Sequence, residues 1–432
     1  MNNLSGLEAL AGGAVVSPFP RLRELLGGSR PGHERPIELT IGEPREIMPD
    51  FVIDKLGEAA ALYGKYPPIK GTDELRRAIA DWVARRYGAG GTAGVTIDPD
   101  SQIVPLNGSR EGLFYAAFPA VARKLASGTL QTGEKPAMLM PNPFYQTYAG
   151  AALACDCQPV YLPATANSGF LPDLENLAAN KDLLRRTAAF YLCSPSNPQG
   201  AVADAGYLAQ ALDLARRHDF MLFADECYSE IYSGEPPPGA LQVAMSGAGG
   251  AVQSARRAGD NDAGGDVFGN LLVFNSLSKR SNLPGLRSGF CLGDRDFIAT
   301  LLEMRNLIGP QMPLPTQHLS AAIWADERHV EVTRRAYREK FDMADEILGS
   351  HYGYRRPAGG FFLWLDMTQW GGGIDATVTL WKGCGVKVLP GAFLAQDDCD
   401  GQNPGKDYVR VALVHDGATI REALERISLV LS

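Results

Sequence analysis

The sequence lacks the features of a membrane protein. None of its apolar runs reaches the roughly 18 residues that a membrane-spanning helix needs. The first residues, MNNLSGLEALAGGAVVSPF, are only weakly apolar and contain no basic leader. We therefore expect a cytoplasmic protein that does not bind a membrane.

Cysteine is scattered rather than patterned. The seven cysteines are an odd number, and only Cys155 and Cys157 lie close together in the sequence. No CxxC pair and no His-rich spacing of metal ligands occurs. We expect reduced thiols and no metal site.

Basic tracts are missing as well. The 49 Asp and Glu residues outnumber the 41 Lys and Arg residues, which gives a formal net charge of −8. A nucleic-acid partner would need clustered positive charge to neutralise phosphates, so we expect none. Acidic small molecules stay possible as substrates, because a few arginines at the binding site can bind them whatever the net charge of the chain. With 432 residues, the chain is long enough for a large and a small domain, or for two of similar size.

Short apolar runs alternate with helix-length segments through the middle of the chain. The runs occupy residues 101–108, 136–143, 187–195, 220–226 and 270–276. Helical patterns lie between them, for example at 110–126 and 205–219. This alternation predicts an α/β fold with a mostly parallel sheet and helices on both faces. Ligands of such sheets bind beyond the carboxyl ends of the strands.

Two segments stand apart from this alternation. Residues 233–268 are rich in Gly, Ala, Pro and Ser, and we interpret them as an insertion or mobile loop. A long helical pattern begins near residue 326, and strand candidates follow at 361–367, 386–390 and 408–414. The second segment indicates a smaller α+β domain.

A lysine lies in a polar stretch directly after the apolar run at 270–276. In SLSKRSNLPGLRSGF, Lys279 follows a serine, and Arg287 comes eight positions later. Most lysines are solvated surface side chains. A lysine that bonds to the aldehyde of pyridoxal phosphate needs further partners, namely a carboxylate for the pyridine nitrogen and donors for the phosphate. We therefore looked for those partners at the ends of other strands.

The carboxylate candidate is Asp225, which ends the apolar run FMLFAD. A buried carboxylate is costly unless it is paired, and a protonated pyridine nitrogen would pair it. Tyr228 and Asn197, the latter in SPSNPQG, are candidates for the phenolate oxygen, and Tyr145 could stack on the ring. Each has a simpler explanation: Asp225 and Asn197 suit ordinary turns, and a single aromatic is more often part of a core.

Phosphate candidates occur in two segments. LNGSREGL runs from a predicted strand through Gly108 into a helix that starts near Ser109, where free backbone N–H groups would bind an anion. An ordinary serine N-cap explains Ser109 equally well. Ser276, Ser278 and Arg287 add hydroxyls and a guanidinium.

Taken in order, these segments resemble the fold-type I, aspartate-aminotransferase-like family of pyridoxal-phosphate enzymes over nearly the whole chain. The blocks that carry the resemblance are YPPIKGTDELRRAIADW, SPSNPQG, DECYSEIY, SLSKRSNLPGLRSGF, PAGGFFLWL and YVRVALV. It implies an aminotransferase with a mostly parallel seven-stranded sheet in its large domain and a smaller α+β domain. We place the large, cofactor-binding domain at 47–325 and the small domain at 1–46 plus 326–432.

The resemblance also implies roles for single residues. Lys279 would bond covalently to the cofactor, and Asp225 would pair with its pyridine nitrogen. Asn197 and Tyr228 would hold the phenolate oxygen, and Tyr145 would stack on the ring. The residues around the phosphate would be Ser109, Arg110, Ser276, Ser278 and Arg287.

Substrate and partner contacts follow from the same resemblance. Arg410, in YVRVALV, would bind the substrate's α-carboxylate with help from Asn197 and the backbone of Gly42. Glutamate and 2-oxoglutarate would be among the substrates. Because the family forms homodimers with shared active sites, Tyr66 would reach the phosphate that the partner subunit binds.

The residues after Lys279 depart from the pattern of many relatives. Ser281 and Asn282 are polar where an aromatic residue is common. The difference points to one particular acidic substrate, whose further carboxylates would need a second basic group. The candidates are Arg23, Lys70, Arg110, Arg280 and Arg305, each of which could instead be a solvated surface cation.

Other functions fit parts of the pattern. The same fold and cofactor would suit an aminotransferase for aromatic or neutral amino acids, or a C–S lyase. A regulator that senses pyridoxal phosphate would carry a DNA-binding domain in front. Only about 40 residues precede the IGEP turn, too few for a winged helix, so we expect an enzyme.

Overall fold

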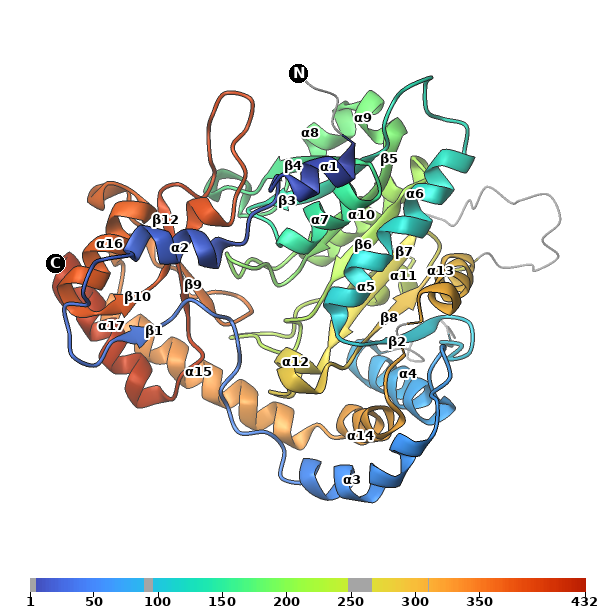
Figure 1. The fold of residues 1–432 in the computed structure, drawn as a ribbon, viewed down its shortest axis with the longest axis horizontal. Coiled ribbons are helices and arrows are strands. Elements are labelled where there is room, and N and C mark those ends of the chain that lie inside the picture. The colour runs from blue at the N-terminus through green and yellow to red at the C-terminus, as the bar shows by residue number, and fades with distance from the viewer. Residues whose placement is uncertain (1–4, 89–95, 248–265, 310) are drawn as a thin grey trace.

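A seven-stranded sheet forms the centre of the computed structural model, which describes residues 5–88, 96–247, 266–309 and 311–432 (Figure 1). Its strands are β2 (Ile103–Leu106), β3 (Ala137–Asn142), β4 (Gln158–Pro163), β5 (Thr187–Cys193), β6 (Met221–Asp225), β7 (Leu271–Ser276) and β8 (Gly289–Gly293). They lie in the order β2-β8-β7-β6-β5-β3-β4. β8 runs antiparallel to the other six strands of this sheet, which are parallel to one another. The predicted α/β fold with a mostly parallel sheet is confirmed.

Helices cover both faces of this sheet because successive side chains of a strand point to opposite sides. In β6, Leu222 and Ala224 join one core, whereas Met221 and Phe223 join the other. The first core includes residues of α3 (Val52–Ala59), α4 (Asp73–Tyr87), α8 (Leu174–Ala179), α9 (Lys181–Arg186), α10 (Ala205–Arg217), α11 (Ala240–Met245) and α14 (Leu314–Ala325). The second includes residues of α5 (Ser109–Tyr115), α6 (Ala117–Ala126), α7 (Gln146–Ala154) and α13 (Arg295–Ile308).

A separate core surrounds a three-stranded antiparallel sheet. In that sheet β12 (Tyr408–Ala412) lies between β11 (Leu389–Pro390) and β9 (Phe362–Asp366). Three helices pack on it, namely α15 (Arg328–Leu348), α16 (Gly373–Cys384) and α17 (Gly417–Leu431). The strands predicted at 361–367 and 408–414 are therefore present.

The strand predicted at 386–390 proved to be two. β10 (Val386–Lys387) pairs in parallel with β1 (Ile37–Glu38), whereas β11 pairs with β12. The apolar pattern runs on without a break because Val388, between the two pieces, is buried as well. A change of pairing partner leaves no mark in such a pattern.

The N-terminal arm contacts both parts of the molecule (Figure 1). Helix α1 (Gly6–Ala11) lies on α7, and the Gly6 backbone N–H donates to Asp156 Oδ1 at 2.7 Å. Helix α2 (Pro18–Leu26) instead packs Leu22 and Leu26 against Trp364 of β9. The domain boundaries at residues 47 and 326 stay a prediction.

Short 3-10 helices complete the fold. They are η1 (Ala60–Gly64), η2 (Ala166–Ser168), η3 (Pro284–Leu286), η4 (His351–Gly353), η5 (Thr368–Trp370) and η6 (Gly391–Phe393). Of the predicted insertion at 233–268, residues 248–265 lie outside the described residues, and α11 precedes them. No helix within the described ranges has the length and apolar character to cross a membrane. The same ranges hold no group of three or more His, Cys, Asp or Glu placed to bind a metal ion.

Candidate active site

The carboxyl ends of β5, β6 and β7 bring several predicted residues to one edge of the large sheet. Asp225, the last residue of β6, is in register with Cys193 of β5 and Phe274 of β7. Lys279 follows β7 in the short helix α12 (Leu277–Arg280). Because parallel strands end at the same edge, residues far apart in the sequence meet there.

Lys279 extends from this edge to the IGEP turn. Its Nζ donates a hydrogen bond to the carbonyl oxygen of Gly42. The same atom lies 6.0 Å from the ring centroid of Tyr228 and 5.3 Å from that of Phe361. Burial among these groups lowers the pKa of Lys279 to about 8, and the charge of Arg410 acts in the same direction. A lysine with this pKa has a useful neutral fraction, so it can act as a nucleophile or a base.

Asp225 is buried and accepts two hydrogen bonds. Tyr148 Oη donates to its Oδ2 at 2.5 Å, and the backbone N–H of Cys227 donates to its Oδ1 at 3.3 Å. Burial raises the pKa of Asp225, and these bonds partly offset that rise. A carboxylate held in this way is suited to a protonated ring nitrogen, which would supply the missing opposite charge.

The acidic pair at the end of β6 is divided between the two faces of the sheet. Glu226 lies on the face opposite Asp225 and accepts hydrogen bonds from Tyr87 Oη and the Ala240 backbone N–H, both at 2.7 Å. Burial raises the pKa of Glu226 to about 7. Only Asp225 of this pair therefore belongs to the candidate site.

Arg410 enters the same space from β12 of the small sheet. Its Nη1 donates to Asn197 Oδ1 at 2.9 Å, and its Nη2 donates to the Thr40 carbonyl oxygen at 2.6 Å. The guanidinium carbon lies 4.3 Å from the ring centroid of Phe362. Burial lowers the pKa of Arg410 to about 10.

No carboxylate among the described residues forms an ion pair with Arg410, and its buried Nε has no acceptor among them. A buried cation without a counter-ion is costly. The site is therefore suited to a ligand that brings its own carboxylate.

Gly108 and Arg287 form one wall of the predicted phosphate site. Arg287 Nη2 donates to the Asn107 carbonyl oxygen at 3.2 Å, and Nη1 donates to that of Pro284 at 3.0 Å. A Cβ atom on Gly108 would lie 2.1 Å from Arg287 Nη2. Gly108 also has a φ of 80°, which favours glycine. Its missing side chain lets the guanidinium lie against the start of α5.

Gly289 brings the predicted serine donors together. It is paired with Leu106 of β2 and with Ser276 of β7. A Cβ atom on Gly289 would lie 3.1 Å from the backbone nitrogen of Ser109 and 3.4 Å from the Cα of Ser276. Ser276 Oγ lies 3.0 Å from Ser278 Oγ. These hydroxyl and amide groups, next to a guanidinium, are the donors that a phosphate requires.

The aromatic candidates differ in their surroundings. Tyr145 Oη accepts a hydrogen bond from Arg110 Nε, and its ring meets Tyr148 edge-on at 5.5 Å. Tyr228 is buried with its ring edge-on to Phe361 at 5.4 Å. Burial raises the pKa of Tyr228 well above its usual value, so its hydroxyl keeps a proton that it can donate.

Three predicted residues lie elsewhere. Tyr66 is 96% exposed, so its ring contacts little of its own chain. Arg280 and Arg305 are each 1% exposed and are bonded to Glu327 and Glu111, respectively. Because both arginines are buried and already paired, neither is available for a substrate.

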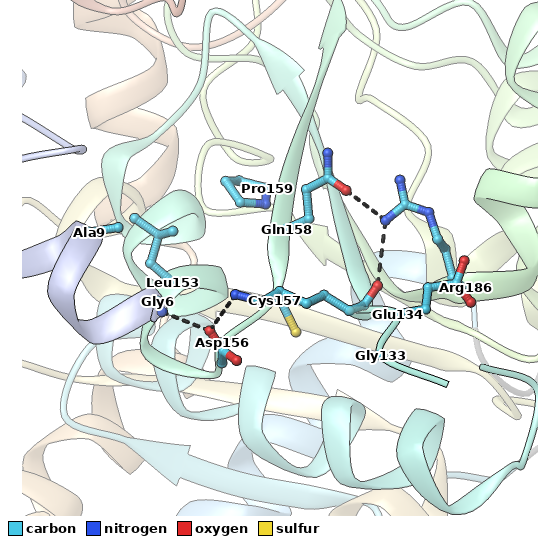
Figure 2. A pocket seen from close by; sticks show the side chains of 11 residues that line it. Gly6, Ala9, Gly133, Glu134, Leu153, Asp156, Cys157, Gln158, Pro159 and Arg186 are labelled. Atoms are coloured by element: carbon cyan, nitrogen blue, oxygen red, sulfur yellow. Dashed lines mark hydrogen bonds and ion pairs between the residues drawn. The ribbon is translucent and has the colours of Figure 1, made fainter. Parts of the chain in front are cut away.

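A surface pocket of about 450 Å³ beside β4 is separate from this constellation (Figure 2). Its charged side chains have partners within it: Lys135 pairs with Asp156 at 2.9 Å, and Arg186 donates to Gln158 at 2.7 Å. None of the predicted site residues lines it. We therefore do not assign the chemistry to this pocket.

Sequence reasoning missed four residues that shape the site, namely Thr40, Tyr148, Phe361 and Phe362. Tyr148 stands three positions after Tyr145, so the helical period already placed the two on one face. The phenylalanines begin a predicted strand, and nothing in that pattern showed that their rings would lie beside Lys279 and Arg410.

Comparison with known proteins defines the family. Residues 34–427 match the model of aminotransferase class I and II, so the chain belongs to that family. LL-diaminopimelate aminotransferase from Moorella thermoacetica is 30% identical over 420 residues, which cover 96% of this chain and 95% of the relative. The enzyme of the same name from Desulforudis audaxviator is 28% identical over 415 residues, 95% and 94% of the two chains.

Solved structures agree with this family. An aminotransferase from Neisseria meningitidis is 38% identical, covers 96% of this chain and 97% of its own, and superimposes with a TM-score of 0.84. The aminotransferase AspB from Helicobacter pylori is 32% identical with a TM-score of 0.81, covering 96% and 98%. The protein is therefore an aminotransferase, and enzymes of this family use pyridoxal 5′-phosphate.

The residues present fit this cofactor. The wall of Gly108 and Arg287 leaves space and a positive charge for a phosphate. Asp225 offers a buried carboxylate for a ring nitrogen, and Lys279 offers an amine of lowered pKa for an aldehyde.

We predict that Gly108→Ala weakens the binding of pyridoxal phosphate by about tenfold or more, because the new Cβ atom would displace the Arg287 guanidinium from the phosphate. Loss of a hydrogen bond to a charged group costs about 1.5–3 kcal/mol. Titration of cofactor-free enzyme, followed by absorbance, measures the affinity. Gly150→Ala in α7 is the matched control, because a Cβ atom there meets nothing within 4 Å. Equal affinities for the two variants would contradict the placement of the phosphate.

We also predict that cofactor-free enzyme captures pyridoxal phosphate covalently with a rate that rises with pH. The neutral amine is the reactive form, and its fraction grows as the pH passes the Lys279 pKa of about 8. Stopped-flow absorbance gives the midpoint, with Lys279→Ala as the control that should capture nothing. A midpoint at the ordinary lysine value of about 10 would show that Lys279 is not buried as described.

Proposed function

We propose that the enzyme transfers the amino group of glutamate to N-succinyl-2-amino-6-oxopimelate, giving 2-oxoglutarate and N-succinyl-LL-2,6-diaminopimelate for lysine and diaminopimelate biosynthesis. The observation that carries the proposal is the buried guanidinium of Arg410, which has no counter-ion among the described residues and lies near the amine of Lys279. An amino-acid substrate brings an α-carboxylate for Arg410 and an α-carbon proton for Lys279.

The substrate skeleton rests on two kinds of similarity. Relatives at 28–30% identity are named LL-diaminopimelate aminotransferases. The segments PNPFYQTYAGAALA, SLSKRSNLPGLRSGF and WADERHV look like those of N-succinyldiaminopimelate aminotransferase. Both names describe a substrate with the diaminopimelate skeleton.

Arg410 and Lys279 divide the work on the substrate. Arg410 exchanges its bond to the Thr40 carbonyl for the α-carboxylate, while Asn197 and the Gly42 backbone help to orient it. Lys279 Nζ, released from the Gly42 carbonyl, takes the proton from the substrate's α-carbon and later returns a proton. Bound pyridoxal phosphate supplies an electron sink for the charge that this creates.

The remaining residues hold the cofactor. Asp225 keeps the ring nitrogen protonated, and Tyr148 fixes the Asp225 carboxylate. Tyr228 donates its hydroxyl proton to the phenolate oxygen, which Asn197 also contacts, and Tyr145 stacks on the ring. The phosphate is held by the side chains of Ser109, Ser276, Ser278 and Arg287 and by the backbone N–H of Arg110 in the first turn of α5, which leaves the Arg110 side chain free for the substrate.

We further propose a homodimer with shared active sites. Tyr66 is nearly fully exposed. Large apolar side chains from the same stretch of sequence are exposed as well, for example Ile47 (86%), Ile53 (67%) and Tyr63 (64%). A second copy would cover this surface and receive Tyr66 at its phosphate site.

Arg110 is the best candidate for a distal carboxylate of the substrate. Among the five basic residues considered, Arg280 and Arg305 are held in ion pairs. Lys70 pairs with Asp100 at the surface, and Arg23 is exposed on α2. Arg110 lies beside Tyr145: its Nε donates to the Tyr145 hydroxyl, and its guanidinium carbon lies 5.4 Å from the centroid of that ring.

The amino-acceptor assay tests the substrate. With 2-oxoglutarate as acceptor, we expect N-succinyl-LL-2,6-diaminopimelate to react with a kcat/KM at least about tenfold above that of LL-diaminopimelate or an aromatic amino acid. Glutamate release measures each rate. Arg410→Ala should raise KM for every amino-acid substrate, because each presents the same α-carboxylate.

Other results would select the other functions. A preference for LL-diaminopimelate would favour the activity for which the curated relatives are named. Pyruvate and ammonia from cystathionine would indicate a C–S lyase. Normal turnover by Lys279→Ala would remove Lys279 from the mechanism.

A further inference from the structure

The three residues after Lys279 are polar and buried, and their side chains form hydrogen bonds to residues outside the candidate substrate space. Arg280, Ser281 and Asn282 are 1%, 0% and 7% exposed. Apart from a bond between Arg280 and Ser281 and one longer contact to Ile47, the partners of these side chains lie between residues 323 and 333, where α14 ends and α15 begins. We propose that these side chains are positioning residues, which fix Lys279 by tying its loop to the start of α15, with Ser281 and His329 as the central link.

Arg280 closes the end of α14. Its Nη1 donates to the Ile323 carbonyl oxygen at 3.1 Å, and its Nη2 donates to that of Asp326 at 3.0 Å and to Glu327 Oε1 at 2.7 Å. The guanidinium carbon lies 5.0 Å from the ring centroid of Trp324. A planar, multiply bonded guanidinium of this kind fixes direction as well as distance.

Ser281, His329 and Asp326 form a directed chain of hydrogen bonds. Arg280 Nη1 donates to Ser281 Oγ at 3.2 Å, and Ser281 Oγ lies 2.8 Å from His329 Nε2. His329 Nδ1 lies 2.5 Å from Asp326 Oδ2. Because Nδ1–H donates to the carboxylate, Nε2 of the neutral ring accepts from the serine hydroxyl. Burial lowers the pKa of His329, which favours this neutral form.

The order serine, histidine, aspartate also occurs in hydrolases, but here it has another purpose. Ser281 has no exposed surface, so its hydroxyl cannot meet a substrate. This chain of hydrogen bonds therefore holds the loop after Lys279 in place. It does so two residues from Lys279, where a shift of the backbone moves Nζ directly.

Asn282 adds a second tie one turn further along α15. Its Nδ2 donates to Thr333 Oγ1 at 2.8 Å. Asn282 has a φ of 54°, a conformation that is uncommon for a non-glycine residue and persists where its surroundings fix it. The bond to Thr333 supplies part of that fixation.

Helix α15 connects this loop to the strand that carries Arg410. Near its middle, Lys340 Nζ donates to the Leu413 carbonyl oxygen at 3.2 Å and pairs with Glu46. Leu413 directly follows β12, which contains Arg410. The substrate must meet Lys279 and Arg410 at the same time, and a misplacement of about 1 Å can slow a reaction about a hundredfold. Fixing the loop to α15 sets the spacing of these two residues.

Ser281→Ala and Thr333→Val in the holoenzyme test the proposal. We expect kcat for glutamate and 2-oxoglutarate exchange to fall about tenfold, with KM changed less than about threefold. We also expect the pH midpoint of the cofactor's absorbance to shift by about half a unit, because that midpoint reports the surroundings of the lysine. Val330→Ala is the control, since Val330 is buried on the same turn of α15 but has no polar group.

Two conservative variants sharpen this test. Thr333→Ser keeps the hydroxyl that accepts from Asn282 and should restore the wild-type midpoint. His329→Gln places an amide near the position of Nε2, whereas His329→Asn does not reach it. The glutamine variant should therefore keep more activity than the asparagine variant. If Ser281→Ala does not fold, the comparison of Thr333→Val with Thr333→Ser decides the question.

The proposal is overturned if the Ser281 and Thr333 variants lose thermal stability as Val330→Ala does, yet keep the wild-type midpoint and kcat. It rests on the proposed role of Lys279, and the two fail in different ways. Normal turnover by Lys279→Ala would reject the role of Lys279 itself. An inactive Lys279→Ala variant beside an unaltered Ser281→Ala variant would reject only the positioning.

Discussion

The burial of the Lys279 amine away from water is the physical constraint on which the other features of the site depend. Near the rings of Tyr228 and Phe361, with the Gly42 carbonyl oxygen as its one hydrogen-bond acceptor among the described residues, the charged form of this lysine loses hydration that these groups do not fully replace. Arg410 adds a second cation to the same space and carries no counter-ion from the described residues. The site therefore combines an amine that has a useful neutral fraction with a charged guanidinium, which is the combination that an amino-acid substrate requires.

The two cations come from different parts of the fold, so their spacing is a property of the tertiary structure. Lys279 follows a strand of the large sheet, and Arg410 lies within the small one. The segment around Gly42 bonds to both cations. Helix α15 bonds to residues next to each of them, namely Ser281, Asn282 and Leu413. A parallel sheet provides the common edge where Asp225 and Lys279 meet, and antiparallel β8 brings Gly289 between the strands that precede the proposed phosphate donors.

Prediction from sequence succeeded where the physical signal is local and repeated. Buried strands in a parallel sheet read as apolar runs, and their ends carry the polar residues that bind ligands, so the α/β fold and the location of Asp225 could be predicted. Prediction failed where the same sequence pattern fits two different structural arrangements. The run at 386–390 is apolar throughout, yet it belongs to two strands with different partners. Arg280 and Arg305 looked like surface cations or substrate contacts, but each is buried with a carboxylate from a distant segment.

The sequence by itself determined the class of fold and the family and singled out Lys279 as the candidate lysine, because these depend on periodicity and on motifs within single segments. Only the tertiary structure decided that Asp225 bonds to Tyr148 on one face of the sheet and Glu226 to Tyr87 on the other. It also decided which residues the polar side chains at 280–282 contact. Those contacts join atoms from segments far apart in the chain. Their energies depend on distance and burial, which a linear pattern does not contain.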